Sequence, residues 1–389
     1  MSLRFLTAGE SHGPQLIVIL EGAPAGYDID LEAINRDLAR RQKGYGRGGR
    51  MAIERDEVRV VSGIRFGRTL GSPITLAVEN RDFKNWEKRM SADPRDRGEA
   101  KLVTRPRPGH ADLAGVLKYN LEDIRDVLER ASARETAARL ALGSIAKQLV
   151  TPFGISVLGY VVSIGNIEAK MPSDISLEQL ALISEESPVR VADADAERAI
   201  IAEIDLCKKE GDTLGGVIEV VAAGLPAGLG SHVQWDRKLD GRIAHALMSL
   251  QAVKGVEFGK GFGAARVRGS QLHDEIGYDA AAQRFTRHSN NSGGTEGGIS
   301  TGEPLRVRAA FKPLSTLMRP LRSTDIKTKA EAVATIERSD VCAIPAAAVI
   351  AESVVAFEIA NAFLEKFAGD SFIETARNYN GYLQQVRDY

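Results

Sequence analysis

Cysteine and long apolar runs are scarce in this 389-residue sequence. Its two cysteines, Cys207 and Cys342, stand in no paired or histidine-linked spacing, so we expect neither a disulfide framework nor a zinc site. The most apolar long stretch, 341–363, is interrupted by a proline and two glutamates, and the N-terminal residues lack a long apolar core. We therefore expect a protein of the reducing cytoplasm with no signal peptide, no membrane span and no metal.

Aromatic residues and net charge are also low. Aromatic residues make up 6% of the chain, and 51 basic side chains nearly cancel 52 acidic ones. Nucleic-acid binders usually pair a basic face with stacking aromatics, so this composition argues against that class. The charge is unevenly distributed, because residues 1–150 carry 26 basic and 21 acidic side chains and the remainder is acidic. The basic excess of the first part indicates a site for anions.

Glycine is abundant, and two glycine clusters match known catalytic patterns in the wrong context. Gly9–Gly13 (GESHG) fits a hydrolase nucleophile elbow, which needs a strand before the serine and a helix after it. Here the chain has barely begun, and a strand is predicted to follow. Gly44–Gly49 fits a dinucleotide fingerprint, but it follows a predicted helix and leads into a predicted strand, the reverse of the required order. We expect neither a serine hydrolase nor a Rossmann site.

Hydrophobic periodicity predicts a mixture of strands and helices. Strands are expected at 15–21, 57–63, 73–79, 155–164, 214–223, 255–259 and 304–311. Helices are expected at 31–42, 113–130, 132–149, 177–185, 195–209, 237–250, 346–367 and 371–387. Ser132 and Glu135 form a predicted capping box. The order lacks the regular alternation of a doubly wound sheet, so the pattern favours a layered α+β fold, with long loops near 80–109 and 286–304.

Arginines gather in glycine-rich segments and near helix starts. Between residues 36 and 68 there are ten basic and four acidic side chains, and arginine predominates. Arginine favours bidentate recognition of carboxylate or phosphate. Two of the six histidines, His12 and His110, lie in such segments and could donate a proton to a bound phosphate. Solvated ion pairs and structural histidines remain open alternatives.

These segments resemble the chorismate synthase family, and the resemblance runs along essentially the whole chain. The matching segments are GESHG (9–13), RRQKGYGRGGR (40–50), RPGHAD (107–112), ERASARETAAR (129–139), GDTLGGVIE (211–219), QWDRKLD (234–240), VKGVEFGKGF (253–262), GGTEGGIS (293–300), FKPLSTL (311–317) and ERSDVCAIPAA (337–347). The resemblance implies an α+β sandwich with helices packed between antiparallel sheets, assembled as a homotetramer. We expect one domain over 1–389, with mobile loops near 80–109 and 286–325 that order over the ligands.

The resemblance also implies a reaction, the last common step of the shikimate pathway to aromatic amino acids. It is the anti 1,4-elimination of phosphate from 5-enolpyruvylshikimate 3-phosphate, which gives chorismate and requires reduced FMN without net redox change. The two ligands together carry on the order of six negative charges, which need paired cations. The arginines implied to bind substrate are Arg41, Arg47, Arg50, Arg107 and Arg134.

The same resemblance assigns flavin-binding and catalytic positions. The positions implied to contact FMN are Arg130, Ala131, Ser132, Gln251, Ala252, Gly297, Lys312, Pro313, Leu314, Ser315, Thr316 and Arg338. His12 would protonate the departing phosphate, and His110 would donate a proton toward the reduced flavin. Asp340 would help deprotonate flavin N5, which then takes the C6 proton of the substrate. From the residues alone, Asp340 could equally cap the helix that starts near Pro345.

Two features bear on the cofactor. Many relatives have two consecutive serines where this chain has Ala131-Ser132, so a role for the first hydroxyl cannot be carried over. The chain shows no extra segment for a nicotinamide-dependent flavin reductase. We therefore expect a monofunctional lyase supplied with reduced FMN by an external flavin reductase, with NADPH only as an indirect reductant.

Two rival interpretations come from other function classes. A binding module could grip nucleic acid with the arginine-glycine loops, and salt-dependent binding without flavin binding would favour it. A transferase or phosphatase could bind the same phosphorylated substrate without flavin, and flavin dependence of turnover decides that case.

Overall fold

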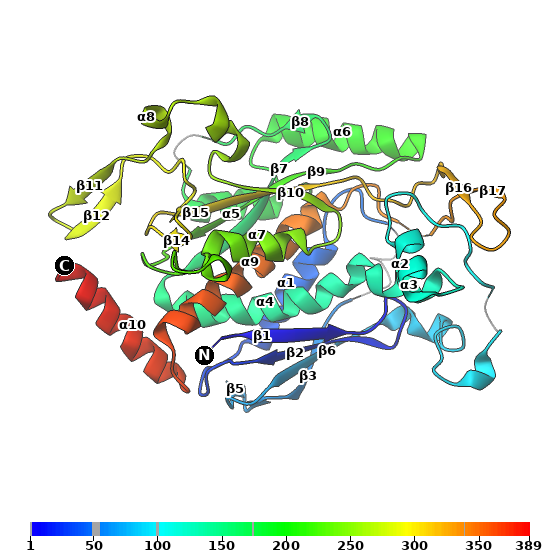
Figure 1. Ribbon diagram of the computed structural model, residues 1–389, viewed down its shortest axis with the longest axis horizontal. Helices are drawn as coiled ribbons and strands as arrows, with labels where there is room; N and C mark the ends of the chain where they lie inside the picture. Colours follow the sequence, from blue (N-terminus) through cyan, green and yellow to red (C-terminus); the bar gives the residue numbers. More distant parts are fainter. Residues whose placement is uncertain (1, 49–54, 99–100, 173–174, 338) are drawn as a thin grey trace.

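The computed structural model describes residues 2–48, 55–98, 101–172, 175–337 and 339–389. Figure 1 shows three layers, with one sheet below, long helices in the middle and a second sheet above. Both sheets are antiparallel and the helices pack between them. The expected α+β sandwich is thus confirmed.

The lower sheet is built from the N-terminal part of the chain. Its strand order is β1-β2-β6-β3, with β1 at Arg4–Ala8, β2 at Gln15–Glu21, β6 at Ile74–Glu79 and β3 at Val58–Ser62. Strand β2 alternates buried and more accessible residues, and its buried side chains Leu16, Val18 and Leu20 join the core. This alternation follows from the two-residue period of a strand with one face covered.

The upper sheet has the strand order β10-β15-β9-β7-β8. Its strands are β10 (Val253–Phe258), β15 (Leu305–Phe311), β9 (Gly216–Ala223), β7 (Ser156–Ile164) and β8 (Ile167–Glu168). The central strands β7 and β9 are buried over most of their length. Both have continuous apolar runs, as expected for strands that are covered on both faces.

Four helices fill the middle layer: α1 (Leu31–Gln42), α4 (Thr136–Val150), α7 (Leu239–Met248) and α9 (Ile344–Phe367). Glycines allow α9 to approach its neighbours closely. A Cβ on Gly143 of α4 would lie 2.3 Å from the Ser353 carbonyl oxygen, and one on Gly159 of β7 would lie 2.2 Å from that of Ala348. Side chains at these two positions would push α9 away from α4 in its own layer and from β7 in the upper sheet.

Helix α9 is long and apolar enough to cross a membrane by length and composition, but 89% of its most apolar window is buried inside the protein. It is the central helix of the core, which explains its apolar composition on every face. The core cluster includes residues from Leu3 to Tyr379 and takes in both sheets.

The remaining elements lie around the three layers (Figure 1). The outer helices are α2 (Asp112–Tyr119), α3 (Arg125–Ala131), α5 (Leu177–Glu186), α6 (Ala194–Glu210), α8 (Gly269–Leu272) and α10 (Phe372–Arg387). The short hairpin strands are β4 (Ile64–Arg65), β5 (Arg68–Thr69), β11 (Ile276–Asp279), β12 (Arg284–Arg287), β13 (Thr295–Glu296), β14 (Ile299–Ser300), β16 (Arg322–Thr324) and β17 (Glu331–Val333).

Each strand and helix predicted from periodicity is present, with local differences. Strand β1 was not predicted, nor were the short strands β4, β5, β8, β11, β12, β13, β14, β16 and β17 or the helix α8. The helix expected at 113–130 is two helices, because Asn120 adopts a left-handed conformation (φ 53°) that ends α2. The capping box is wrong in detail, since the Ser132 hydroxyl accepts from the Arg134 N–H and starts a 3-10 turn, Ala133–Glu135, ahead of α4. Glu135 binds Thr7 and Arg139 instead.

Candidate active site

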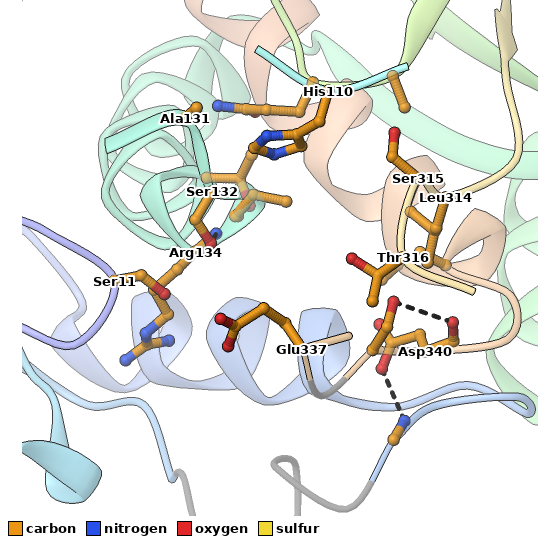
Figure 2. Close-up of a pocket in the computed structure, with 18 of the residues that line it drawn as sticks. Ser11, His110, Ala131, Ser132, Arg134, Leu314, Ser315, Thr316, Glu337 and Asp340 are labelled. Carbon is orange, nitrogen blue, oxygen red and sulfur yellow. Dashed lines mark hydrogen bonds between the residues drawn. The ribbon is translucent and has the colours of Figure 1, made fainter. Parts of the chain in front are cut away.

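A cavity of about 670 Å³ lies where segments from distant parts of the sequence meet. Its walls come from the GESHG loop, the loop before α2, the turn that leads into α4, the segment after β15 and the first turns of α9. In Figure 2, His110 lies above the open space, Ala131 and Ser132 on one side, Leu314, Ser315 and Thr316 on the other, and Glu337 and Asp340 below. Two helical segments, the 3-10 turn Ala133–Glu135 and α9, begin at this cavity.

Most of the residues expected from the sequence meet in this cavity. Those that line it are His12, Arg41, Arg47, Arg107, His110, Ala131, Ser132, Arg134, Gln251, Ala252, Lys312, Leu314, Ser315, Thr316 and Asp340. Arg50 and Arg338 lie outside the described residues. Arg130, Pro313 and Gly297 are not among the lining residues that the structure describes.

Arg130 and Gly297 have other surroundings. The Arg130 guanidinium donates to the carbonyl oxygens of Thr7 at 2.8 Å and Gly9 at 3.2 Å, and so ties α3 to the GESHG loop. Gly297 lies in the turn between β13 and β14 with φ +61°, where an added Cβ would meet only the His232 side chain at 3.9 Å. Arg130 thus supports the wall that carries His12, whereas Gly297 is not among the described residues that line the cavity.

Arg41 and Arg134 share one buried carboxylate. The Asp56 Oδ2 atom accepts from Arg134 Nη1 at 2.7 Å and from Arg41 Nη1 at 3.4 Å, and all three residues are buried. Burial lowers the pKa of the Arg41 guanidinium, and the nearby charges of Arg134 and Arg47 lower it further, against the opposing effect of Asp56. The charges of Asp56 and Asp340 both act on Arg41, and the guanidinium groups that line the cavity would attract an anion there.

Asp340 binds Arg47 and does not cap the helix that follows it. Its carboxylate pairs with Arg47 Nη1 at 3.0 Å and accepts from the Gly48 N–H at 2.6 Å; Figure 2 marks the latter bond. Helix α9 starts at Ile344 with Ala343 as its N-cap, without a side-chain cap. This geometry removes the capping alternative and joins Asp340 to the arginine loop.

His110 and Arg107 are both held by Asp112. The Asp112 Oδ1 atom lies 2.5 Å from His110 Nδ1, and its Oδ2 atom accepts from the Arg107 backbone N–H at 3.0 Å and side-chain Nε at 2.9 Å. Burial alone would raise the pKa of Asp112, but hydrogen bonds from His110 and Arg107 hold it well below its usual value. Asp112 therefore stays an acceptor, so His110 Nδ1 carries a proton. Arg107 Nη2 lies 3.1 Å from Nδ1 and 3.5 Å from Nε2 of the same ring.

His12 is held by Glu129 and covered by Trp86. Its Nδ1 atom lies 2.9 Å from Glu129 Oε1, and its backbone N–H donates to Glu129 Oε2 at 2.8 Å. The His12 and Trp86 rings stack with centroids 4.0 Å apart. The imidazole is thus fixed both in its plane and on one face.

The opposite wall carries Lys312, Ser315 and Gln251. Lys312 Nζ donates to the Gly109 carbonyl oxygen and to Ser315 Oγ, both at 2.8 Å. Burial lowers the pKa of the Lys312 ammonium, and Lys254 adds to this effect. The buried Gln251 Oε1 atom has no hydrogen-bond partner among the described residues, so it can accept a hydrogen bond from a ligand.

Sequence reasoning missed several residues of this site. Ser11, Trp86 and Glu337 line the cavity, and Glu129 and Asp112 hold the two histidines. Trp86 offered a signal, because it is one of two tryptophans in the chain and lies in an otherwise polar segment. The strand β1 before Ser11 also corrects one argument against a nucleophile elbow, but the strand β2 that follows still excludes it.

Comparison with known proteins agrees with this arrangement. A family model described as "Chorismate synthase" matches residues 3–364. Proteins named chorismate synthase are 60% identical over 389 residues in Symbiobacterium thermophilum, covering 99% of each chain, and 58% identical over 393 residues in Geobacter sulfurreducens, covering all of both. A solved structure titled "Crystal Structure of Chorismate Synthase" superposes with a TM-score of 0.81 at 42% identity, over 100% of this chain and 99% of that one. The chain belongs to the chorismate synthase family.

Proposed function

We propose that this chain catalyses the anti 1,4-elimination of phosphate from 5-enolpyruvylshikimate 3-phosphate to give chorismate, in the presence of reduced FMN. The observation that carries the proposal is one cavity in which Arg41, Arg107 and Arg134 are at most 8% exposed. His12 and His110 line the same cavity, and each binds a buried carboxylate through Nδ1. The cavity therefore brings together several arginines that can bind anions and two histidines whose rings are held in fixed orientations.

The substrate fits the charges of the site. A phosphate and two carboxylates need several bidentate donors in a place that excludes water. Arg41, Arg107 and Arg134 supply guanidinium groups already fixed by Asp56 and Asp112, so little side-chain entropy is lost when the substrate binds. Arginine positions the substrate and neutralises the charge that develops on the departing phosphate.

In the elimination, the C–O bond to phosphate breaks with its electron pair, C6 loses a proton and a new double bond forms, with no net redox change. His12 donates a proton from Nε2 to the departing phosphate. Asp340, held by Arg47 and the Gly48 N–H, offers a carboxylate that can accept a proton on the other side of the cavity. His110 holds a proton on the wall near Lys312 and Ser315, as expected for a group that faces the cofactor.

FMN fits the residues around the cavity. Gln251 Oε1 is a buried acceptor for a ring N–H, Lys312 is a cation on the same wall, and the turn at Ser132 lines the cavity as well. When bound, reduced FMN supplies electron density that assists the loss of phosphate. Arg338 and Gly297 remain proposed contacts from the resemblance alone.

We also propose the cellular setting of the enzyme. It works in the cytoplasm as a monofunctional homotetramer, without nucleic acid or membrane partners, and an external flavin reductase supplies the reduced FMN. NADPH would act only through that reductase. Turnover driven by NADPH in the purified protein, without added reductase or reductant, would contradict this part.

The test is anaerobic turnover of 5-enolpyruvylshikimate 3-phosphate with and without reduced FMN, following phosphate release. Chorismate and phosphate should form in equal amounts only with reduced FMN. Phosphate release that is independent of flavin would identify a phosphatase or transferase instead.

A further inference from the structure

Glu129, near the C-terminal end of α3, contacts His12 at several atoms, and the proposed reaction steps do not use this residue. Its side chain is 2% exposed. The carboxylate accepts from the His12 backbone N–H at 2.8 Å, and His12 Nδ1 lies 2.9 Å from Oε1 and 3.0 Å from Oε2. The Glu129 carbonyl oxygen also accepts from the Ser11 N–H at 3.1 Å. One buried residue thus fixes both the backbone and the ring of the histidine.

The charge state of Glu129 defines the tautomer of His12. Burial alone would raise the pKa of Glu129, but hydrogen bonds and charge from His12, together with a hydrogen bond from Arg125, lower it below its usual value. An ionised carboxylate only accepts hydrogen bonds, so the proton between the two residues sits on His12 Nδ1. Nε2 is then the ring nitrogen available to a molecule in the cavity that His12 lines.

Arg125 connects the Glu129 carboxylate to the other side of the cavity. Its Nη1 donates to Glu129 Oε1 at 2.8 Å, and its Nη2 donates to Glu337 Oε1 at 2.9 Å. The guanidinium carbon also lies 4.9 Å from the centroid of the Trp86 ring, which stacks on His12. Arg125 therefore competes with His12 for the negative charge of Glu129.

We propose that Glu129 is the positioning residue of His12, directing Nε2 to the cavity and stabilising the protonated imidazole, and that Arg125 limits this stabilisation. This inference rests on the proposed function in one respect, namely that His12 is a proton donor in the reaction. The placement and protonation of the ring can be measured without substrate or flavin.

The stacked Trp86 is a built-in reporter of His12. Protonated imidazole in contact with an indole quenches its fluorescence more strongly than neutral imidazole does. Trp235, the other tryptophan of the chain, is 78% exposed and absent from the residues that line the cavity. In a Trp235→Phe background, the pH dependence of tryptophan emission therefore reports the protonation of His12.

The experiment compares Glu129→Gln and Arg125→Gln in that background, between pH 5 and 9. Glu129→Gln removes the adjacent negative charge, so the midpoint of the fluorescence titration should fall by about one pH unit or more. Arg125→Gln removes a cation from the other side of Glu129, so the midpoint should rise. General loosening of the site would move both midpoints in the same direction. Coincident midpoints, or shifts of the same sign, would overturn the proposal.

Other charged groups remain the same in all variants. They are Arg41, Arg47, Arg107, His110, Arg134, Lys312, Glu337 and Asp340 around the cavity, and Arg89 and Asp82 beside Trp86, where Asp82 accepts from the indole N–H at 3.4 Å. His12→Asn should abolish the transition, and a transition that persists in it would overturn the proposal. If Glu129→Gln does not fold, the upward shift in Arg125→Gln still tests it.

Turnover gives a second readout that separates the two proposals. Glu129→Gln should lower kcat with KM nearly unchanged, and Glu129→Asp should recover part of the loss because it keeps the charge. The two variants could shift the fluorescence midpoint in opposite directions while the parent protein forms no chorismate. That result would support the positioning of His12 by Glu129 and refute the proposed function.

Discussion

His12 and His110 reach the cavity from different loops, yet each binds a buried carboxylate through Nδ1. The two carboxylates differ in their second partner. Glu129 is shared with Arg125, which does not line the described cavity, whereas Asp112 is shared with the cavity residue Arg107. A change at Asp112 thus affects anion binding and proton transfer together, and a change at Glu129 affects mainly proton transfer.

The two histidines of the cavity, His12 and His110, are expected to transfer protons. His12→Ala and His110→Ala should each lower the turnover rate by about two to four powers of ten, the usual contribution of a positioned acid or base. His273→Ala, which changes an exposed histidine outside the described cavity, is the matched control. Rates like those of the parent protein in both cavity variants would refute the assigned proton transfers.

A second prediction concerns Glu352 of α9, which is buried among cations. Its carboxylate accepts from Arg40 Nη1 at 2.8 Å, Lys147 Nζ at 2.6 Å and the Gly159 N–H at 3.0 Å. Glu352→Gln leaves two partly buried cations, which also pair with Asp37, with less compensating charge and should lower the free energy of unfolding by about 3 kcal/mol at pH 7. Glu374→Gln, which breaks an exposed pair with Arg377, should cost less than about 1 kcal/mol.

The pH dependence of this effect follows from the pKa of Glu352. Burial would raise it, but the charges of Lys147 and Arg40 and their hydrogen bonds lower it. The stabilisation is therefore complete above the unfolded value, near ~4.3, and is lost as the pH falls toward the folded value. Denaturant unfolding should show the gap between parent and Glu352→Gln narrowing below about pH 4; a gap that widens there would contradict the account.

Among the elements, α9 depends on close approach to β7. Gly159→Ala would place a Cβ 2.2 Å from the Ala348 carbonyl oxygen, and neither backbone can yield without moving the helix. The expected loss is about 1–3 kcal/mol of unfolding free energy in a denaturant titration. Gly255→Ala in β10, whose nearest neighbour would be the Ala310 side chain at 3.7 Å, should be nearly neutral. Equal effects of the two changes would refute this packing argument.

The spacing of apolar residues was enough to predict the longer strands and helices, because the buried side chains of each of them recur at a regular interval along the sequence. It missed β1, which holds only five residues, and the strands and helix of two to four residues outside the core. It also missed the break at Asn120, where a left-handed residue ends a helix that the apolar pattern would continue. Family resemblance led to the arginines and histidines of the cavity. Their partners Asp56, Asp112 and Glu129 could not be assigned, because pairing with a buried guanidinium or imidazole depends on tertiary placement.

In the whole molecule, the basic first part and the acidic remainder meet at one cavity. Residues 9–136 supply most of its arginines and both histidines, and residues 214–350 supply the opposite wall. We propose that the chain is one domain, since its core cluster includes residues from Leu3 to Tyr379. The proposed ordering of the loops near 80–109 and 286–325 over both ligands would then close the cavity from the surface, although β13, β14, β15 and β16 in the second range are already formed in the structure.

We propose that this cavity breaks a carbon–oxygen bond by elimination and does not hydrolyse a phosphate ester. The most direct test is turnover with reduced FMN in water enriched in oxygen-18, followed by mass analysis of the released phosphate. Elimination predicts phosphate without any solvent oxygen, because the ester oxygen leaves with it. One solvent oxygen in each phosphate would show phosphorus–oxygen cleavage and contradict the account.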